Sequence, residues 1–193
     1  MAKNVIIGQS GGPTAVINSS LAGVYKAACS LGADKVYGMQ YGIEGLLKEE
    51  MVELNVLFGD RMSIELLKRT PSSYLGSCRY KLPDPEADPA PFIKLFTLFD
   101  KYDICALFYI GGNDSMDTIA KLSRYGAKVG SSVRFIGVPK TIDNDLCLTD
   151  HTPGYGSAAK YIATILKEVI RDSSVYNIRS VTVAEIMGRH AGW

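Results

Sequence analysis

The segment that decides the fold reads ICALFYIGGNDS and covers residues 104–115. Residues 104–110 form a continuous apolar run, which is typical of a central strand in a parallel sheet. A glycine pair follows, and the apolar spacing then predicts a helix from about Met116 to Tyr125. A strand that leads through glycines into a helix is the building unit of an α/β fold.

The same order of strand, glycines and helix occurs at the amino end. A strand is predicted over residues 3–8, and Gly11 and Gly12 separate it from a helix predicted over residues 15–30. Further strands are predicted at 35–39, 51–54, 133–138 and 180–186, further helices at 60–68, 91–102 and 157–171, and a short helix or turn at 42–50. This alternation predicts a three-layer α/β fold with a mostly parallel, doubly wound sheet, in which ligands bind outside the carboxyl ends of the strands.

Composition and charge exclude several classes of protein. Of the 193 residues, 47% are hydrophobic and 21% are charged, which are globular values. The formal net charge of +1 gives no reason to expect nucleic acid or an anionic membrane as a partner. No apolar run reaches the roughly 18 residues of a membrane helix. The four cysteines lack CxxC spacing, so we expect reduced thiols in a cytoplasmic protein.

Two carboxylates follow the strand predicted at 133–138. Residues 137–145 read GVPKTIDND, and Pro139 ends the strand because it has no N–H to donate. Side chains at i and i+2 of an extended segment project to the same side, so we expect Asp143 and Asp145 to face one pocket. One carboxylate could then accept a proton while the other holds a divalent cation. The alternative is a solvated, Asx-rich turn.

Polar or glycine-rich segments follow several predicted strands. They cover residues 8–14, 111–115, 139–145 and 187–189. In a parallel sheet these segments all open toward one rim. A long loop over residues 70–91 adds Arg79 and Lys81, and long loops in compact domains are often functional. The convergence predicts an enzyme that handles phosphorylated, metal-bound groups, although each segment taken singly also fits a tight turn or solvated surface cations.

Five segments resemble the phosphofructokinase family in their order and approximate spacing, and the resemblance covers essentially the whole chain. They are Gly11-Gly12, Gly76–Arg79, Gly111–Ser115, Pro139–Asp145 and Met187-Gly188-Arg189. The resemblance implies a phosphofructokinase-like fold. It also implies transfer of a phosphoryl group to the 1-hydroxyl of fructose 6-phosphate, with Mg²⁺ as the cofactor.

The resemblance also implies roles for single residues. Asp143 resembles the base that accepts the proton of the sugar hydroxyl, and Thr141 resembles a contact to the transferred phosphoryl group or the sugar phosphate. Arg79 resembles the cation that bridges donor and sugar, and Asp145 the metal-linked acid. The segment that binds the sugar phosphate is then Met187, Gly188 and Arg189, and the donor-binding residues are Gly11, Gly12, Gly112, Asp114, Ser115 and Lys140.

Two departures from the ATP-using members indicate the phosphoryl donor. Those members have G-G-D-G-S and P-G-T where this chain has G-G-N-D-S and P-K-T. Asp114 sets a carboxylate against the α-phosphate of a nucleotide, which is repulsive, whereas Lys140 adds a catalytic cation close to the transferred phosphoryl group. Both features resemble the pyrophosphate-dependent branch, whose reaction is reversible. Asn113 replaces an acid, and its amide and the Asp114 carboxylate are further candidates for the metal site.

Several alternatives stay open. ATP remains the donor if Asp114 and Lys140 merely pair with each other. A non-catalytic phosphate-binding subunit of the same family is a second alternative, which the presence of Asp143 and Arg79 disfavours. A lipid or dinucleotide kinase of the wider superfamily is a third, which the segment 187–189 disfavours.

Family members continue well past Trp193, so the chain resembles an amino-terminal portion with a truncated fold. We expect residues 1–140 to form the phosphoryl-donor-binding domain and residues 141–193 to begin an incomplete sugar-phosphate-binding domain. The isolated piece is expected to be inactive or prone to aggregate, because strands from Ser180 onward lack neighbours. For the full-length protein the resemblance implies a homo-oligomer.

Overall fold

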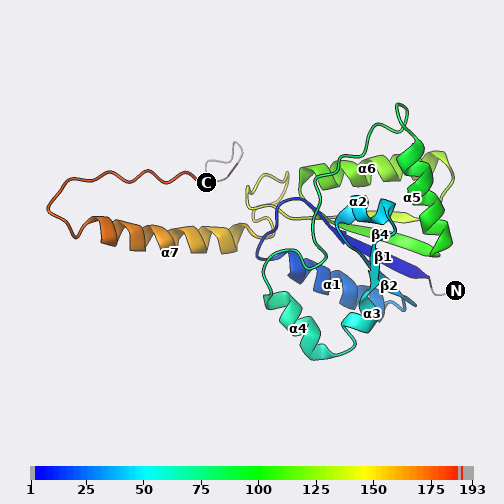
Figure 1. Cartoon of the computed structure of the whole chain (residues 1–193), viewed down its shortest axis with the longest axis horizontal. Coiled ribbons are helices and arrows are strands. Elements are labelled where there is room, and N and C mark those ends of the chain that lie inside the picture. Colours follow the sequence, from blue (N-terminus) through cyan, green and yellow to red (C-terminus); the bar gives the residue numbers. More distant parts are fainter. Residues whose placement is uncertain (1–2, 187, 189–193) are drawn as a thin grey trace. The chain divides into compact units, whose positions relative to one another are not determined.

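The structure is a computed structural model that describes residues 3–186 and residue 188. The chain divides into two units, residues 1–140 and residues 141–193. Figure 1 labels their helices and the strands β1, β2 and β4. Among the described residues, the first unit holds a five-stranded sheet with helices on both faces, and the second holds one long helix with its flanking segments.

The sheet of the first unit confirms the expected, mostly parallel arrangement. Its strand order is β3-β2-β1-β4-β5. The strands are β1 (Asn4–Gln9), β2 (Val36–Met39), β3 (Met51–Glu53), β4 (Ile104–Gly111) and β5 (Arg134–Pro139). Neighbouring strands are parallel, except that the short edge strand β3 is antiparallel to β2. The strand order reverses between β1 and β4, and ligands bind at such a switch point.

Helices cover both faces of the sheet, which confirms the three layers. In the first unit they are α1 (Ile17–Ser30), α2 (Gly42–Leu47), α3 (Leu54–Leu57), α4 (Arg61–Arg69), α5 (Ala90–Lys101) and α6 (Asn113–Lys128). Figure 1 shows α1, α3 and α4 on one face and α2, α5 and α6 on the other. Each face of the sheet carries its own hydrophobic core. Along β1, Val5 and Ile7 belong to the core on the α1 face and Ile6 to the core on the α5 face, as the two-residue period of a strand requires.

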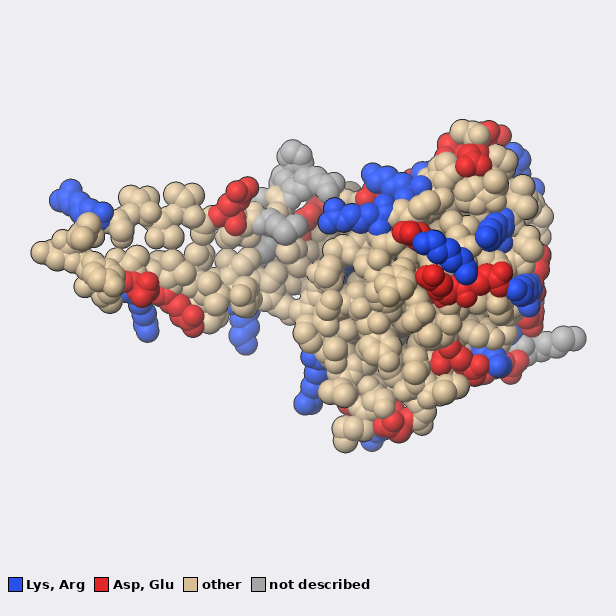
Figure 2. All heavy atoms as spheres, in the orientation of Figure 1, with Lys and Arg blue, Asp and Glu red and all other residues tan. Residues whose placement is uncertain are grey.

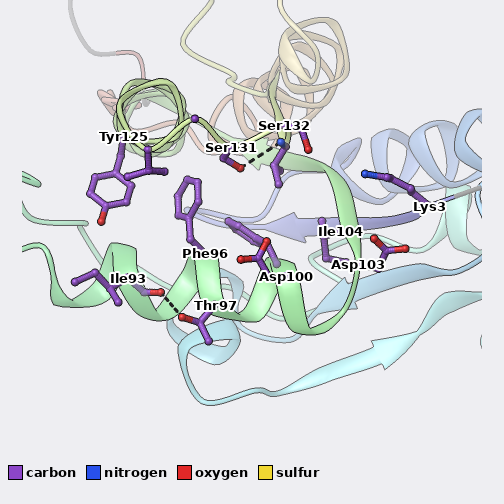
Figure 3. A pocket seen from close by; sticks show the side chains of 14 residues that line it. Lys3, Ile93, Phe96, Thr97, Asp100, Asp103, Ile104, Tyr125, Ser131 and Ser132 are labelled. Carbon is purple, nitrogen blue, oxygen red and sulfur yellow. Dashed lines mark hydrogen bonds between the residues drawn. The ribbon is translucent and has the colours of Figure 1, made fainter. Parts of the chain in front are cut away.

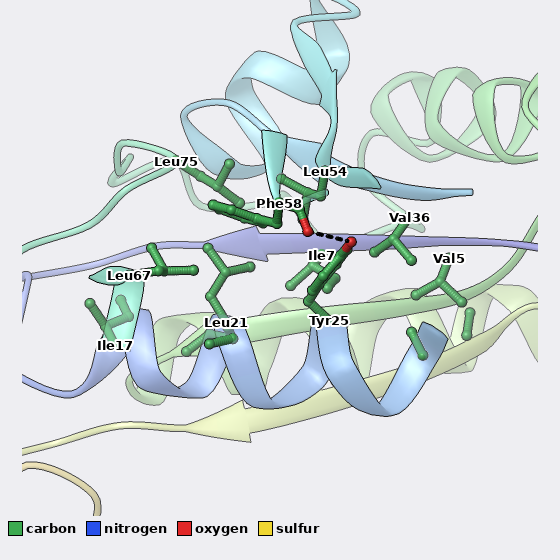
Figure 4. Close-up of a cluster of buried hydrophobic side chains, with 14 residues drawn as sticks. Val5, Ile7, Ile17, Leu21, Tyr25, Val36, Leu54, Phe58, Leu67 and Leu75 are labelled. Atoms are coloured by element: carbon green, nitrogen blue, oxygen red, sulfur yellow. Dashed lines mark hydrogen bonds between the residues drawn. The ribbon is translucent and has the colours of Figure 1, made fainter. Parts of the chain in front are cut away.

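The core on the α1 face is built from apolar side chains that recur along this helix. Ile17, Leu21 and Tyr25 are each about one turn apart and buried against the sheet (Figure 4). The Tyr25 hydroxyl donates a hydrogen bond to the Phe58 carbonyl at 3.3 Å, so its polar atom is satisfied as well. This packing fixes the start of α1 and therefore the glycine turn that joins it to β1.

Leu107→Ala is expected to destabilise the first unit by about 2–5 kcal/mol, because it leaves a cavity in a packed core. Leu107 lies in the middle of β4 and is 0% exposed. Leu31→Ala is the matched control, since Leu31 is 88% exposed, and its loss is expected to stay within about 0.5 kcal/mol. Urea unfolding followed by circular dichroism measures both variants. Equal losses would contradict the assignment of Leu107 to the core.

The helix after β4 begins earlier than the sequence indicated. Residues 113–115 are expected in a loop before a helix from about Met116, but α6 begins at Asn113. The Gly112 carbonyl accepts hydrogen bonds from the N–H groups of Ser115 at 3.0 Å and Met116 at 3.1 Å. The Gly112 carbonyl therefore accepts the first hydrogen bonds of the helix, and residues 113–115 form its first turn. Apolar spacing begins only at Met116 and cannot detect a polar first turn.

The strand predicted over residues 180–186 is wrong, because the segment forms no strand and exposes Val181 and Val183. Alternating side chains give the right pattern, yet a strand also needs a neighbour for its N–H and C=O groups. Within the described part of the chain, no strand pairs with this segment. Leu54, expected at the end of a strand, instead opens the short helix α3.

The second unit starts with a loop and continues into α7 (Tyr155–Ser173), which is longer at both ends than expected. Thr141 and Gly154 form an isolated bridge that closes the loop. Gly154 has φ = +103°, a conformation that favours glycine at the point where the chain turns into the helix. None of the described residues of α7 is buried.

The charged side chains of the first unit are mixed in sign. Figure 2 shows Lys and Arg beside Asp and Glu across the visible face. Several form exposed ion pairs, such as Lys35 with Glu53 at 2.9 Å and Lys128 with Glu86 at 2.7 Å, and pairs of this kind stabilise little. As for membrane spans, no described helix combines the length and the apolar character that crossing a bilayer requires.

Candidate active site

The carboxyl ends of β1, β4 and β5 are joined by hydrogen bonds. The Ser10 N–H donates to the Ile110 carbonyl and the Lys140 N–H to the Gly111 carbonyl, both at 2.9 Å. The Ser10 and Ser115 hydroxyls are also hydrogen-bonded, which links β1 to the first turn of α6. The residues predicted to bind the phosphoryl donor thus lie together at the switch point of the sheet. They are Gly11, Gly12, Gly112, Ser115 and Lys140.

Lys140 is a buried cation at this edge of the sheet. Its residue is 7% exposed, and its ammonium donates a hydrogen bond to the Gly12 carbonyl. Gly11 has φ = +77°, and a Cβ built there would lie 3.4 Å from Lys140 Nζ. The left-handed backbone favours glycine at this position. An anion that binds at the glycine turn would therefore meet a positive charge already in place.

Open space lies beside both glycine turns. Among the described residues, a Cβ at Gly12 would have no neighbour within 4 Å, and one at Gly112 would meet the Lys140 carbonyl oxygen at 3.8 Å. α6 begins directly after Gly112, and the N–H groups and dipole of a helix amino end attract negative charge. The backbone of this edge can therefore approach a phosphate group closely.

Asp114 lies in the first turn of α6, where the helix dipole favours a carboxylate. Its Oδ1 lies 3.2 Å from Lys81 Nζ, and both side chains are largely exposed. Lys81 belongs to the loop between α4 and α5, and Lys121 of α6 holds this loop by donating to the Leu82 carbonyl at 2.9 Å. The ion-pair partner of Asp114 is thus Lys81, which the sequence marked only as a cation of the loop.

Arg79 follows a loop segment that is tied to the first glycine turn. The Gly11 N–H donates to the Cys78 carbonyl at 3.2 Å, and the Ser77 hydroxyl donates to the Gly11 carbonyl at 2.5 Å. Arg79 comes next in the chain and is exposed. The backbone just before Arg79 is therefore held at the glycine turn, and the role of Arg79 as the bridging cation stays a prediction.

Tyr109 is a buried polar residue that no sequence signal marks, because it belongs to an apolar run. Its hydroxyl accepts a hydrogen bond from the Ile43 N–H at 3.2 Å and lies 3.7 Å from Cys78 Sγ. Burial raises the pKa of Tyr109 above its ordinary value, so the hydroxyl stays neutral at pH 7. Tyr109 therefore supports the loop at Cys78 without adding charge to the site.

The T-I-D-N-D segment of the second unit is a turn organised by Asn144. This residue has φ = +54°. Its Nδ2 donates to the Asp150 carbonyl at 3.0 Å, and its Oδ1 accepts from the Thr152 N–H at 2.9 Å. The Thr152 hydroxyl donates in turn to the Thr141 carbonyl at 2.7 Å. Side-chain hydrogen bonds thus hold the backbone that carries the predicted base.

The backbone between Asp143 and Asp145 is not the extended segment that the sequence suggested, and whether the two carboxylates face one pocket stays a prediction. The i, i+2 rule holds for extended backbone, and the left-handed Asn144 between them interrupts it. Asp143 is half-buried, with its N–H donated to Thr141 Oγ1 at 3.0 Å, and Asp145 is exposed. The Asx-rich turn describes the local backbone, and the chemical roles of Thr141, Asp143 and Asp145 stay predictions.

The residues predicted to hold a metal ion lie on separate segments of the chain. Within residues 3–186 and 188, no group of three or more His, Cys, Asp or Glu side chains could hold a metal ion. Mg²⁺ is usually held by one or two carboxylates together with phosphate oxygens of the substrate. The carboxylates of Asp145 and Asp114 and the amide of Asn113 are therefore donors of a suitable chemical type.

The segment expected to bind the sugar phosphate is described at Gly188 alone. Gly188 is half-buried and has φ = +153°. Met187 and Arg189 lie outside the described residues. The sugar contacts implied for this segment stay predictions.

A cavity of about 570 Å³ lies at the amino ends of the strands, opposite the ends that carry the candidate site (Figure 3). It is lined by Phe96 and Asp100 of α5, by Ile104 at the start of β4 and by Ser131 and Ser132 before β5. These residues surround the amino ends of the strands. The cavity is therefore separate from the edge at which parallel sheets bind ligands.

The chain matches the phosphofructokinase family over residues 4–193. The pyrophosphate--fructose 6-phosphate 1-phosphotransferase of Halomonas elongata is 45% identical over 195 aligned positions, which cover 98% of this chain and 46% of that protein. The ATP-dependent 6-phosphofructokinase of Glaesserella parasuis is 34% identical over 198 positions, which cover 100% of this chain and 55% of that protein. The resemblance seen in the five segments is thus confirmed across the chain.

Solved structures agree with these matches. The pyrophosphate-dependent phosphofructokinase of Nitrosospira multiformis superposes with a TM-score of 0.81 at 42% identity, over 89% of this chain and 42% of that one. The fold expected from the sequence is therefore confirmed. The chain spans about half the length of the curated relatives it matches.

Proposed function

The chain belongs to the phosphofructokinase family, and on that premise we propose a function for the protein that contains it. The protein transfers a phosphoryl group from pyrophosphate to the 1-hydroxyl of fructose 6-phosphate, with Mg²⁺. Residues 1–140 bind the donor, and residues 141–193 begin the sugar-phosphate-binding domain. The single observation that carries the choice of donor is the buried ammonium of Lys140 at the Gly11-Gly12 turn.

Lys140 favours a short, dense anion. Phosphoryl transfer concentrates charge on the non-bridging oxygens, so catalysis depends on positioning and on cations and N–H donors already in place. An ammonium that is fixed on the Gly12 carbonyl needs no reorganisation when this charge develops. Pyrophosphate also carries no nucleoside that must pass the Asp114 carboxylate, whereas the α-phosphate of ATP would meet a like charge there.

On the acceptor side, Asp143 takes the proton of the sugar 1-hydroxyl. The oxygen of this hydroxyl attacks one phosphorus of pyrophosphate, and the other half of the pyrophosphate leaves as phosphate. Thr141 contacts the transferred group, Arg79 bridges donor and sugar, and segment 187–189 holds the sugar phosphate. Mg²⁺, when bound, neutralises charge on the donor oxygens, and Asp145 is the proposed acid for it.

The relatives support this choice of donor. The protein at 45% identity is named for pyrophosphate, and the one named for ATP is 34% identical. We further propose a cytoplasmic homo-oligomer. All four cysteines are free thiols, which fits a reducing compartment.

A comparison of donors tests the proposal. The protein is expressed from its own gene, and formation of fructose 1,6-bisphosphate is followed with pyrophosphate or with ATP. We expect turnover with pyrophosphate to exceed that with ATP by at least about tenfold, or about 1.4 kcal/mol of transition-state stabilisation. Faster turnover with ATP would reject pyrophosphate as the donor. Binding of pyrophosphate without turnover would instead place the protein in the non-catalytic class.

A further inference from the structure

Two side-chain amides are buried at the end of β1 and at the start of α1, where the proposed function gives them no role. They belong to Gln9 and Asn18, and both residues are 0% exposed. Burying an amide costs free energy unless its donors and its acceptor are hydrogen-bonded. The partners of this amide pair therefore show what the two residues hold in place.

Gln9 joins three segments of the first unit. Its Nε2 donates to the Ile17 carbonyl at 3.2 Å and to Asn18 Oδ1 at 3.0 Å, which ties the end of β1 to the start of α1. Its Oε1 accepts from the Leu75 N–H at 2.9 Å, and it shares the Ser73 hydroxyl, at 3.0 Å, with the Gly76 carbonyl. Both of these donors belong to the loop between α4 and α5.

Asn18 holds the same loop at two further points. Its Nδ2 donates to the Thr70 carbonyl at 2.9 Å, and its Oδ1 accepts from the Tyr74 N–H at 2.8 Å. Residues 70–75 have no helix or strand of their own. Buried backbone groups in such a segment need partners elsewhere, and the amide pair supplies them. Apolar side chains of similar size would leave these groups without those bonds.

The loop then passes directly to the predicted bridging cation. Gly76 turns the chain with φ = +74°, and the next two residues form the hydrogen bonds to Gly11. Arg79 follows. The backbone that leads to Arg79 is thus held by the amide pair before Gly76 and by Gly11 after it. Without the amide pair, the loop would keep the bond from the Tyr41 N–H to the Leu75 carbonyl at 2.8 Å and the bonds to Gly11, but it would lose its ties to Gln9 and Asn18.

We propose that Gln9 and Asn18 are positioning residues for Arg79. Neither side chain touches a substrate, and both set where the loop presents the guanidinium to the phosphoryl donor. This inference rests on the proposed function, in which Arg79 bridges donor and sugar. A merely structural role would lower stability without any coupling to Arg79.

A double-mutant cycle between Asn18 and Arg79 tests the proposal on the protein expressed from its own gene. Asn18→Ala alone is expected to lower kcat/KM for pyrophosphate by about 10–100-fold, the effect of misplacing a catalytic group. In the Arg79→Ala background, the same change is expected to cost less than about threefold, because residues that act through one group are not additive. Amide hydrogen exchange at Tyr74 and Leu75 is expected to become faster in Asn18→Ala.

Ser19→Ala is the matched control. Ser19 lies next to Asn18 on α1, and its hydroxyl donates to the Lys68 carbonyl at 2.9 Å, outside the segment 70–75. Its kcat/KM is expected to stay within about twofold of the parent value. Should Asn18→Ala fail to fold, Ser73→Ala replaces it in the cycle, since it removes the hydroxyl that contacts both Gln9 Oε1 and the Gly76 carbonyl on the way to Arg79.

The outcomes separate this inference from the proposed function. If the parent protein turns over pyrophosphate and the two substitutions multiply in their effects, the positioning role is overturned and the function stands. Unchanged exchange at Tyr74 and Leu75 would also overturn it. A parent protein without turnover on pyrophosphate would reject the function first and, with it, this role of the amide pair.

Discussion

Asp143→Asn is expected to lower turnover by about 10²–10⁴-fold, the usual contribution of a positioned general base. The KM for fructose 6-phosphate is expected to change by less than about threefold, because the loss falls on the transition state. The amide has the size of the carboxylate but cannot take up the proton. The turn should persist, since the bond from the Asp143 N–H to Thr141 Oγ1 uses only the backbone of residue 143. Steady-state kinetics in both directions measure kcat and KM.

Asp150→Asn is the matched control for this substitution. Asp150 is exposed in the same loop, and only its backbone carbonyl takes part in the Asn144 hydrogen bond. This control is expected to keep the parent rates. Near-normal turnover of Asp143→Asn would contradict its assignment as the base.

A double variant, Asp114→Gly with Lys140→Gly, is expected to reverse the donor preference. Removing one preorganised group that stabilises the charge of the transition state typically costs about 10²–10³-fold in turnover. Loss of the Lys140 ammonium should therefore lower the rate with pyrophosphate by that amount. Turnover with ATP should then exceed turnover with pyrophosphate, because the Asp114 carboxylate that would repel the α-phosphate of ATP is gone. The buried position of Lys140 on the Gly12 carbonyl makes it the larger contributor. The measurement is kcat/KM for each donor with fructose 6-phosphate held constant.

Asp117→Gly controls for the effect of glycine on α6. Asp117 is a turn further along the helix and pairs with Lys121 at 2.7 Å. Glycine weakens a helix by about 1 kcal/mol relative to alanine at either position, whereas only residue 114 lies in the first turn, after Gly112. The control should keep its preference for pyrophosphate. A double variant that also keeps it would show that Asp114 and Lys140 do not select the donor.

Much of the fold could be predicted because β1, β4 and α1 carry strong and regular patterns. Ile104–Gly111 is apolar on both faces, as a central parallel strand must be. The errors occurred where local pattern was not the deciding factor. Residues 180–186 alternate like a strand but have no strand partner among the described residues. α6 starts at polar Asn113, because the Gly112 carbonyl accepts hydrogen bonds from the N–H groups of Ser115 and Met116.

The candidate site divides in the same way. The order of the glycine turns along the chain placed the donor residues at one edge of the sheet, since parallel strands share their carboxyl ends. Spacing could not give the conformation between Asp143 and Asp145, where the left-handed Asn144 forms hydrogen bonds with Asp150 and Thr152 further along the same loop. The Lys81–Asp114 pair likewise joins residues far apart in the chain.

By itself, the sequence determined the family, the mostly parallel sheet and the edge at which chemistry is proposed, because these follow from local patterns and from motif order. Tertiary structure alone decided which groups meet. It set the Lys140 ammonium on the Gly12 carbonyl and joined Gln9 and Asn18 to the loop that leads to Arg79. The physical reason is that a buried ammonium or amide must find hydrogen-bond partners, and packing brings those partners from segments that sequence spacing does not relate.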